Sequence, residues 1–281
     1  MMERPSSSRI AEFKNIIYSY FEENGRSFPW RTDTRPWGVL VSEFMLQQTQ
    51  TERVIPYWER WMQIWPTPES LDKVSLEDAL KEWLGLGYNR RGRYVKDCAR
   101  IITRRYGGKV PETPAELVTL PGIGSYTAGA IACFAYNYPG VFIETNIRAS
   151  VLHFFFHERT GVKDREILPI LEDALDRENP RRWYWALMDY GVALKKLTAN
   201  PGRRSAHYTL QSPFEGSFRQ IRGGLVRTLV SQGPASAGEL LERTGFEPED
   251  LYRALEILEK EAMVAESGGL YRISEEEQPS E

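Results

Sequence analysis

The sequence predicts an all-α fold of short helices followed by a small winged-helix-like module, and three observations support this. Apolar residues recur at intervals of three and four through the first two hundred residues, as at Leu80, Trp83 and Leu84. Capped helix starts, such as the one at residues 67–70, and frequent glycines and prolines separate these segments. Strand-like alternation is scarce until the end of the chain. We therefore expect short helices joined by short connections.

The last part of the chain has a pattern of its own. A polar connector at residues 201–217 is followed by three segments with helical periodicity and a hairpin signal around Gly268 and Gly269. The helices are expected at residues 219–231, 235–244 and 248–261, and the strands at 263–265 and 270–273. This order is typical of a winged helix. We predict a core at residues 1–212, the winged-helix-like domain at 213–273 and a disordered acidic tail at 274–281.

The charge is unevenly distributed along the chain. Residues 1–222 contain 31 Lys and Arg against 26 Asp and Glu, whereas residues 223–281 contain 5 against 13. The first part suits a phosphate partner, and the acidic last part favours protein docking or simple packing over contact with a duplex. No apolar run is long enough for a membrane span, and residues 1–10 lack the apolar core of a signal peptide. We expect a cytoplasmic, nucleoid-associated monomer that does not bind a membrane.

Two cysteines, Cys98 and Cys133, each lie in an apolar helical context. Such a setting favours two buried free thiols over a disulfide. Two thiols cannot hold a four-thiolate cluster or a structural zinc ion. We therefore expect no metal site.

Residues 120–124 read Leu-Pro-Gly-Ile-Gly and predict a hairpin between two helices. Pro121 stops the incoming helix, while Gly122 and Gly124 permit positive φ and a close approach by another backbone. The next helix starts at Ser125 and presents its unpaired amides and positive dipole end. Such a turn can clamp a DNA phosphate without reading sequence. An ordinary helix-turn-helix with a glycine turn is the alternative.

Further motifs surround the hairpin. Residues 28–31 read Phe-Pro-Trp-Arg, residues 41–50 read Val-Ser-Glu-Phe-Met-Leu-Gln-Gln-Thr-Gln, residues 83–88 read Trp-Leu-Gly-Leu-Gly-Tyr, and Glu144 lies twenty residues past the hairpin. From about residue 26 to residue 194 the chain resembles the MutY-like adenine glycosylase branch of the helix-hairpin-helix (HhH-GPD) DNA glycosylase superfamily. The resemblance implies two helical subdomains, a base excision repair activity and double-stranded DNA with a mismatched or damaged base as partner. It does not extend to the winged-helix part.

The resemblance also implies a division of catalytic roles. Glycosidic hydrolysis needs an acid for the leaving base and stabilisation of a sugar cation, which two carboxylates can share. Glu43 would protonate the base, with a pKa raised by apolar neighbours. Glu144 would stabilise the cation, supported by hydrogen bonds from Tyr126 and Asn146. From the residues alone, a helix-surface glutamate is the favoured interpretation of Glu43, and Glu144 could equally be a helix cap.

DNA contact and base recognition are assigned in the same way. Gln48 is the candidate wedge that fills the hole left by a flipped base, and Tyr88 would stack beside the opposite base. Tyr88 could instead be a core aromatic, and the basic run at residues 89–93 could be a solvated helix face. The implied DNA contacts are Gln48, Thr49, Tyr88, Arg91, Gly122, Gly124, Ser125 and Thr127. The implied base pocket consists of Arg26, Trp30, Arg31, Leu46 and Trp185.

The chain departs from the family pattern at several positions. The region at residues 194–207, where the family holds an iron–sulfur cluster, has no cysteine, so no cluster is expected. The one ligand that the resemblance implies is a monovalent cation at the hairpin. Glu144 replaces an aspartate, and Trp185 replaces a Gln or Glu that reads adenine. Tyr126 stands where lyases of the superfamily carry a lysine, which predicts a monofunctional enzyme.

Three functions remain open. The first is a monofunctional glycosylase that removes adenine opposite guanine or 8-oxoguanine. The second is a thymine or uracil mismatch glycosylase on the same scaffold. The third is a catalytically weak protein that binds damaged DNA, although a binder has no need of Glu43 beside Gln48. The module could contact the duplex, check the opposite base or dock a protein partner.

Overall fold

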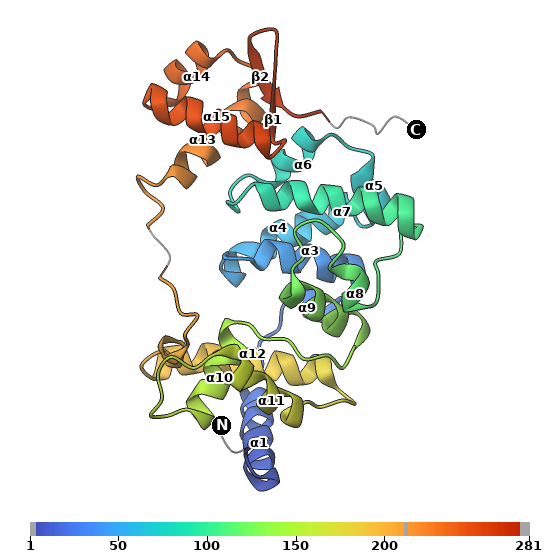
Figure 1. The fold of residues 1–281 in the computed structure, drawn as a ribbon. Coiled ribbons are helices and arrows are strands. Elements are labelled where there is room, and N and C mark those ends of the chain that lie inside the picture. Colours follow the sequence, from blue (N-terminus) through green and yellow to red (C-terminus); the bar gives the residue numbers. More distant parts are fainter. Residues whose placement is uncertain (1–3, 211–212, 276–281) are drawn as a thin grey trace. The chain divides into compact units, whose positions relative to one another are not determined.

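The computed structural model describes residues 4–210 and 213–275, and these are almost wholly helical (Figure 1). They form two compact units. The first unit spans Met1–Val39, Glu112–Thr119 and Ile123–Leu210. The second spans Leu40–Pro111, Leu120–Gly122 and Gln211–Glu281. The expected all-α fold with a small C-terminal sheet is confirmed.

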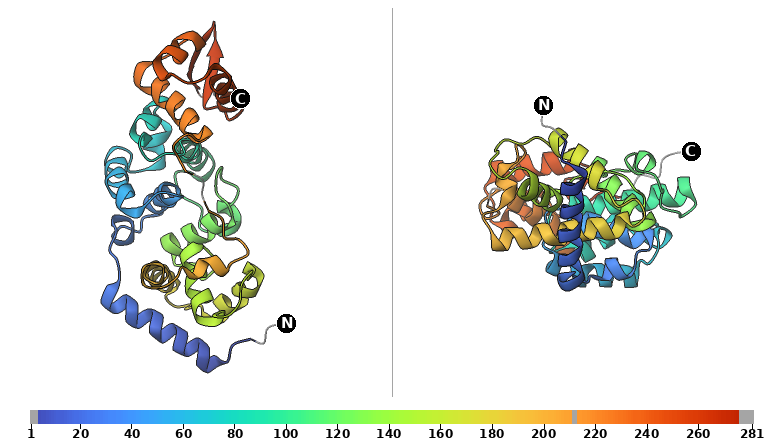
Figure 2. Two further views of the ribbon diagram at one scale, coloured as in Figure 1. Left: turned by 90° about the vertical axis from the view of Figure 1, so that its left-hand side faces the viewer. Right: turned by 90° about the horizontal axis from the view of Figure 1, so that it is seen from below.

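The first unit is built around two long helices, α1 and α12, and α12 packs against both α1 and α10. Figure 2 shows α1, in dark blue, as one unbroken helix. The elements of this unit are α1 (Ser7–Asn24), α2 (Pro29–Thr32), the start of α3 (Pro36–Leu46), α8 (Pro114–Leu117), α9 (Ser125–Tyr136), α10 (Thr145–Phe155), α11 (Asp164–Ala174), α12 (Pro180–Leu197) and the 3-10 turn η1 (Pro201–Arg204).

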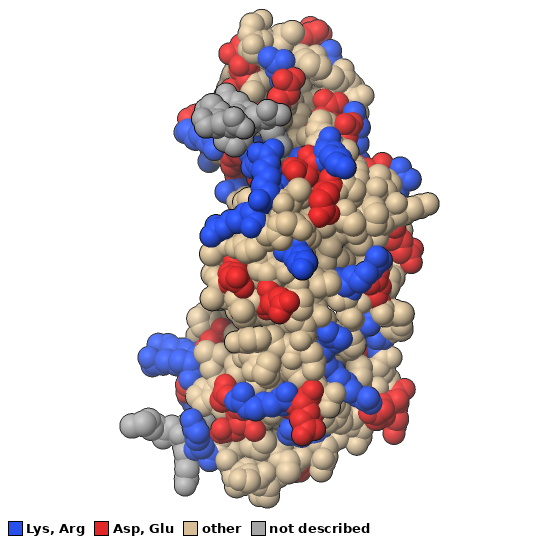
Figure 3. Space-filling model, turned by 90° about the vertical axis from the view of Figure 1, so that its right-hand side faces the viewer, with Lys and Arg blue, Asp and Glu red and all other residues tan. Residues whose placement is uncertain are grey.

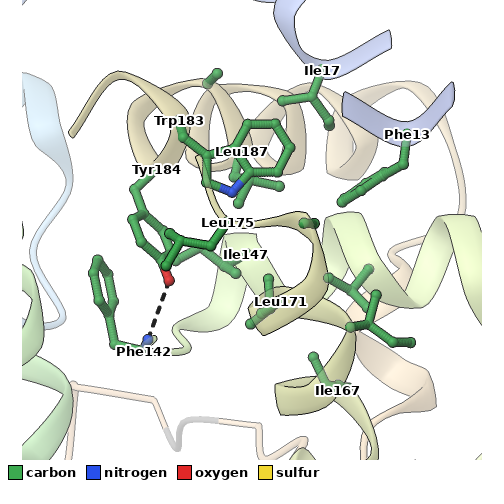
Figure 4. Packing of buried hydrophobic residues seen from close by; sticks show 14 of the residues in the cluster. Phe13, Ile17, Phe142, Ile147, Ile167, Leu171, Leu175, Trp183, Tyr184 and Leu187 are labelled. Atoms are coloured by element: carbon green, nitrogen blue, oxygen red, sulfur yellow. Dashed lines mark hydrogen bonds between the residues drawn. The ribbon is translucent and has the colours of Figure 1, made fainter. Parts of the chain in front are cut away.

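The core of the first unit anchors the segment that leads into α10. Phe13 of α1 packs edge-on against Trp183 of α12, with ring centroids 5.8 Å apart (Figure 4). The neighbouring Tyr184 stacks on Phe142 at 3.9 Å, and its hydroxyl accepts a hydrogen bond from the main-chain amide of Phe142. It donates in turn to the carbonyl of Gly140. Buried aromatic packing and a satisfied hydroxyl therefore fix the chain two residues before Glu144.

The second unit contains most of α3 and a second tryptophan-rich core. Trp61 lies 4.7 Å from Trp65 and 5.5 Å from Trp83, measured between ring centroids. The predicted capped start at residues 67–70 is confirmed, and Ser75 caps α6 in the same way. The remaining elements are α4 (Thr51–Ile64), α5 (Pro68–Asp72), α6 (Leu76–Trp83), α7 (Arg90–Tyr106), α13 (Phe218–Gln232), α14 (Ala237–Thr244), α15 (Pro248–Lys260), β1 (Val264–Ser267) and β2 (Leu270–Ile273).

The C-terminal helices and hairpin confirm the predicted pattern, with boundaries shifted by a residue or two. β1 and β2 pair antiparallel with Val264 opposite Ile273, and Ala235 bridges to Tyr271 beside them. Helices α13 and α15 pack together and against these strands. The domain boundary at residue 212 stays a prediction, and most of the predicted tail at 274–281 lies outside the described residues.

Cys98 and Cys133 are both buried and free, as predicted. Over residues 4–210 and 213–275, no helix combines the length and apolar character needed to cross a bilayer. Figure 3 shows one face of the molecule, on which basic and acidic side chains are interspersed.

Candidate active site

Glu144 is the N-cap of α10. Its Oε1 accepts hydrogen bonds from the main-chain amides of Asn146 (2.6 Å) and Ile147 (2.7 Å). These amides have no acceptor within the helix, so the helix-cap interpretation is confirmed. Burial raises the pKa of Glu144, and the two amide hydrogen bonds act in the opposite direction. Amide donors favour the charged form of a carboxyl group, so they offset part of the cost of burying Glu144 as a carboxylate.

Asn146 is held between Glu144 and a lysine that the sequence analysis missed. Its Nδ2 donates to Oε2 of Glu144 at 3.2 Å, and its Oδ1 accepts from Nζ of Lys195 at 2.7 Å. The two contacts fix which end of the amide faces the carboxylate. Burial lowers the pKa of Lys195, while the charge of Glu144 opposes that shift. The structure thus brings together the predicted pair Glu144 and Asn146 and adds Lys195.

A close helix contact places Lys195 beside Asn146. A Cβ at Gly191 of α12 would overlap the main-chain carbonyl of Asn146, so only glycine permits this approach. One turn earlier, the hydroxyl of Ser150 donates to the carbonyl of Leu187. Leu187, Gly191 and Lys195 are spaced by four and share one helix face. This spacing is the signal that could have identified Lys195 from the sequence.

Tyr126 lies in the second position of α9. Its ring centroid is 6.0 Å from that of Phe142, on the segment that leads to Glu144. A Cβ at Gly129 would also overlap the side chain of Phe142, so α9 packs closely on this segment. Tyr126 therefore lies on the helix that packs against the approach to Glu144, and its supporting role stays a prediction.

Two of the predicted pocket residues, Arg26 and Arg31, converge on Asp189 of α12. Arg31 donates to both carboxylate oxygens at 2.8 and 2.9 Å, and Arg26 donates from its main-chain amide, Nε and Nη2 at 2.6–2.8 Å. Burial alone would raise the pKa of Asp189, but the hydrogen bonds and charges of the two arginines lower it. The sequence analysis missed Asp189. Since the side chain of Arg31 is only 8% exposed and already paired, it is suited to shape a wall rather than to donate to a base.

Aromatic rings complete this cluster in the first unit. Trp30 is buried and stacks on Phe28 at 5.3 Å, and the guanidinium of Arg31 lies over both Phe28 and Trp185. Trp185 also stacks on Phe134 at 6.1 Å. The structure therefore brings together four of the five predicted pocket residues. The fifth, Leu46, is half-buried at the end of α3 in the second unit.

Glu43 lies inside α3 and is only 6% exposed. Its helix neighbours Val41, Phe44 and Met45 are also buried. The helix-surface alternative for Glu43 is therefore wrong. Burial by itself disfavours the charged form of a carboxyl group, which fits an acid that must carry a proton.

The two predicted wedge residues stand on exposed loops of the second unit. Gln48 has φ of 56° and Tyr88 has φ of 49°, so both adopt the left-handed backbone that side chains other than glycine rarely take. Both are exposed, Tyr88 to 37%, so the core-aromatic alternative for Tyr88 is wrong. Strained backbone held by its surroundings clusters at functional sites.

Arg91 ties these two loops together. Its Nη1 donates to the carbonyls of Phe44, Met45 and Gln47, and its Nη2 donates to the hydroxyl of Thr49 and to the carbonyls of Leu86 and Gly87. Arg91 is 6% exposed, and burial lowers its pKa to about 10. The prediction that Arg91 contacts a DNA phosphate is therefore wrong, because its guanidinium is committed to main-chain oxygens. Thr49, also predicted to contact DNA, uses its hydroxyl in the same network.

The hairpin shows the predicted turn at its first glycine only. Gly122 has φ of +74° and lies where a Cβ would overlap Tyr94. Gly124 is extended, with φ of −88°, so the positive φ allowed for it is not used; it is exposed, with open space around it. Ser125 is exposed, but Thr127 is 5% exposed, so its side chain cannot reach a phosphate. The first bond within α9 runs from Ala128 to Gly124, which leaves the earlier amides without helical acceptors.

The ligands of a family-type cluster are lacking. The chain has two cysteines, at residues 98 and 133, and neither lies in the region at residues 194–207. In the part of the chain that the structure describes, no group of three His, Cys, Asp or Glu residues could hold a metal ion. These donors do not fit a four-thiolate iron–sulfur cluster.

Comparison with known proteins gives three kinds of match. The family model described as "HhH-GPD superfamily base excision DNA repair protein" matches residues 41–176. The "Adenine DNA glycosylase" of Mycobacterium tuberculosis is 33% identical over 275 residues, covering 88% of each chain. The rat protein of the same name is 42% identical over 147 residues, which is 49% of this chain and 28% of the rat protein.

Solved structures show the same fold. A thermostable thymine-DNA glycosylase matches with a TM-score of 0.59 and 22% identity over 66% of this chain and 86% of its own. A trapped endonuclease III–DNA covalent intermediate matches with a TM-score of 0.57 and 19% identity over 75% of this chain and 91% of its own.

Proposed function

The chain belongs to the HhH-GPD superfamily of base excision DNA repair proteins, and we propose that it is a DNA N-glycosylase that removes adenine mispaired in double-stranded DNA. The observation that carries the proposal is a buried carboxyl group, Glu43, five residues before the exposed wedge Gln48, in a chain similar along most of its length to adenine DNA glycosylases. The expected opposite base is guanine or 8-oxoguanine.

The reaction divides between two carboxyl groups. Glu43 donates a proton to a ring nitrogen of the flipped purine, which makes the base a better leaving group. The Glu144 carboxylate stabilises the positive charge that develops on the sugar, and Asn146 and Tyr126 hold it in place. Water then adds to the sugar and gives up a proton, which restores the protonated Glu43, so the products are the free base and an abasic site. Tyr126 has no amine with which to attack the sugar, so the enzyme is monofunctional.

The DNA contacts divide between main chain and side chains. The amides of Gly124, Ser125 and Thr127 at the start of α9 face one phosphate, with a monovalent cation bound at the hairpin. Gln48 enters the duplex in place of the flipped base, and Tyr88 stacks beside the opposite base. Arg91 and Thr49 support these loops rather than touching DNA.

Trp185 favours a second candidate, a thymine or uracil glycosylase acting on mismatches with guanine. The indole stacks on Phe134 and under Arg31, and it can donate only one hydrogen bond. It therefore cannot make the paired contact with adenine that a carboxamide makes. The flat indole of Trp185 can stack on a pyrimidine as well as on a purine.

One assay separates these functions. Duplexes that each carry one mispair (adenine with 8-oxoguanine or guanine, thymine or uracil with guanine) are incubated under single-turnover conditions and then heated in alkali. We expect cleavage of the adenine duplexes after alkali and none before it, since base loss without lyase action leaves the strand intact. Cleavage of only the pyrimidine duplexes supports the second candidate, and cleavage of none supports the damaged-DNA-binding protein.

The same assay tests the acid. Glu43→Gln removes the proton donor and keeps the size, so we expect the rate of base release to fall by about 100-fold or more. Glu59→Gln, an exposed glutamate of α4, is the matched control and should leave the rate unchanged. If Glu43→Gln behaves like the control, the catalytic assignment of Glu43 fails.

A further inference from the structure

The C-terminal module reaches the loop that carries Tyr88. Arg219 is the second residue of α13, and its Nη1 donates a hydrogen bond to the hydroxyl of Tyr88. Its guanidinium also lies over the Tyr88 ring, 5.7 Å from the centroid. Residues 131 positions apart in the sequence therefore share two contacts, one polar and one with the face of the ring.

A second guanidinium lies over the same ring. Arg91, which ties the loops of Gln48 and Tyr88 together, has its guanidinium 5.4 Å from the Tyr88 centroid. Tyr88 is thus contacted by one arginine of α7 and one of the C-terminal module. Because its backbone is left-handed and its side chain is 37% exposed, its orientation depends on such contacts rather than on burial.

Ion pairs hold α13 at this position. Glu261, at the end of α15, accepts hydrogen bonds from Arg222 of α13 and from Arg90 at the start of α7. Its side chain is only 14% exposed, so the pairs are partly shielded from water. Arg90 follows Tyr88 by two residues, and Arg222 follows Arg219 by three. Glu261 therefore joins the segment that carries Tyr88 to the helix that carries Arg219.

The contacting edge of the module is basic although the module as a whole is acidic. Arg219 and Arg222 lie at the start of α13, whereas residues 223–281 contain 13 Asp and Glu against 5 Lys and Arg. The positive groups of this edge are committed to Tyr88 and Glu261. This distribution fits a module that acts on the wedge more than one that grips phosphates.

We propose that Arg219 of the C-terminal module is a positioning residue for Tyr88, so that the module takes part in reading the base opposite the excised one. The proposal rests on the proposed function, because only a glycosylase has a base to read at that place. Arg219 fixes the hydroxyl and the ring plane of Tyr88, and Tyr88 stacks beside the opposite base. Arg219 itself touches neither the substrate base nor the sugar.

The test compares opposite bases. Single-turnover rates and KM are measured for two duplexes, one with adenine opposite 8-oxoguanine and one with adenine opposite cytosine. The proteins compared are wild type, Arg219→Ala, Arg219→Lys and the control Arg227→Ala. Arg227 is an exposed arginine further along α13. We expect Arg219→Ala to lower the ratio of kcat/KM for the 8-oxoguanine duplex to kcat/KM for the cytosine duplex by about tenfold. The loss of a charge-assisted hydrogen bond and a cation–π contact can account for a change of this size. Arg219→Lys should restore part of the ratio, because an ammonium still donates to the hydroxyl.

Two further measurements separate positioning from a general loss of structure. A 2-aminopurine placed next to the opposite base reports stacking, and its fluorescence in the complex should rise in Arg219→Ala. Tyr88→Phe lacks the hydroxyl, so adding Arg219→Ala to it should change the ratio by less than the single changes predict. Thermal unfolding of each variant is recorded alongside.

The outcomes are distinct. If wild type releases no base from any duplex, the proposed function fails. If wild type is active and Arg219→Ala matches Arg227→Ala in both the ratio and the fluorescence, the inference about Arg219 is overturned. Additive effects of Tyr88→Phe and Arg219→Ala would also overturn it, since residues that act through one contact do not add.

Discussion

At the scale of single residues, Glu144 shows how one side chain can serve a helix and a reaction. Glutamate is not among the favoured N-cap residues, which have short side chains. Here Oε1 folds back to the amides of Asn146 and Ile147. The longer side chain of glutamate is thus accommodated within the cap. Oε2 remains on the side of Asn146, which Lys195 orients.

Glu144→Gln should separate the two roles. The amide oxygen of glutamine can still accept from the helix start, but it cannot stabilise a cation as a carboxylate does, so activity should fall by about 100-fold. Burial raises the pKa of Glu144 above its unfolded value, with amide hydrogen bonds opposing. A raised pKa means that the stabilising contribution is complete below the unfolded pKa and is lost as the pH rises through the folded pKa.

Urea unfolding measures this consequence. The free energy of unfolding of Glu144→Gln, relative to wild type, should increase from acid pH to mildly alkaline pH. Glu144→Asp keeps an ionisable group and a short cap and is the control for the chemistry; it should retain most of the activity. A stability difference that does not change with pH would show that burial does not dominate the pKa of Glu144.

At the scale of elements, the motifs singled out the loops of Gln48 and Tyr88, but not the contacts that join these loops. The run at residues 89–93 suggests a solvated face, yet Arg91 belongs to the buried stripe of α7 with Val95, Cys98 and Ile102. That stripe has helical spacing and could have placed Arg91 inside. What it could not supply is the set of carbonyls around the guanidinium, because those of Phe44, Met45 and Gln47 come from a segment more than forty residues earlier in the sequence. Asp189 was missed for a similar reason, since its arginine partners lie about 160 residues away.

Arg91→Lys tests this junction. An ammonium is a compact donor and cannot span main-chain oxygens on both loops, so several buried carbonyls lose their partner. We expect a loss of about 2–4 kcal/mol in the free energy of unfolding. Arg104→Lys, at an exposed position of the same helix, should change it by less than about 0.5 kcal/mol. Equal stability of the two variants would contradict the role of Arg91.

At the scale of the whole molecule, the fold class and the order of elements were predictable because hydrophobic spacing and capping are local signals. The backbone pairing of residues 201–206 was not predictable in this way. Here η1 is joined to the segment before α11 by main-chain bonds, from Val162 to Arg204 and from Ala206 to Val162, both at 2.9 Å. The side chain of Arg204 also donates to the carbonyl of Leu152. Backbone pairing therefore stabilises this region.

Because this backbone pairing uses no thiolate, removal of divalent and transition-metal ions should have no effect on folding or base release. After dialysis against EDTA, the protein should keep its melting temperature and its single-turnover rate to within about twofold, and anaerobic treatment with iron and sulfide should produce no visible cluster absorbance. The measurements are thermal unfolding, the mispair assay and an absorption spectrum. Loss of activity on EDTA treatment that zinc or iron restores would contradict this prediction.

The shared support of the two wedge loops has a consequence for how this enzyme can diverge. Since the loops of Gln48 and Tyr88 depend on the same guanidinium, a substitution of Arg91 alters both loops at once, and neither loop can be changed through Arg91 while the other keeps its shape. Lineages that change substrate should therefore preserve this arginine while exchanging the two exposed side chains it supports. Engineering of a new base preference can likewise exchange Gln48 and Tyr88 but should keep Arg91.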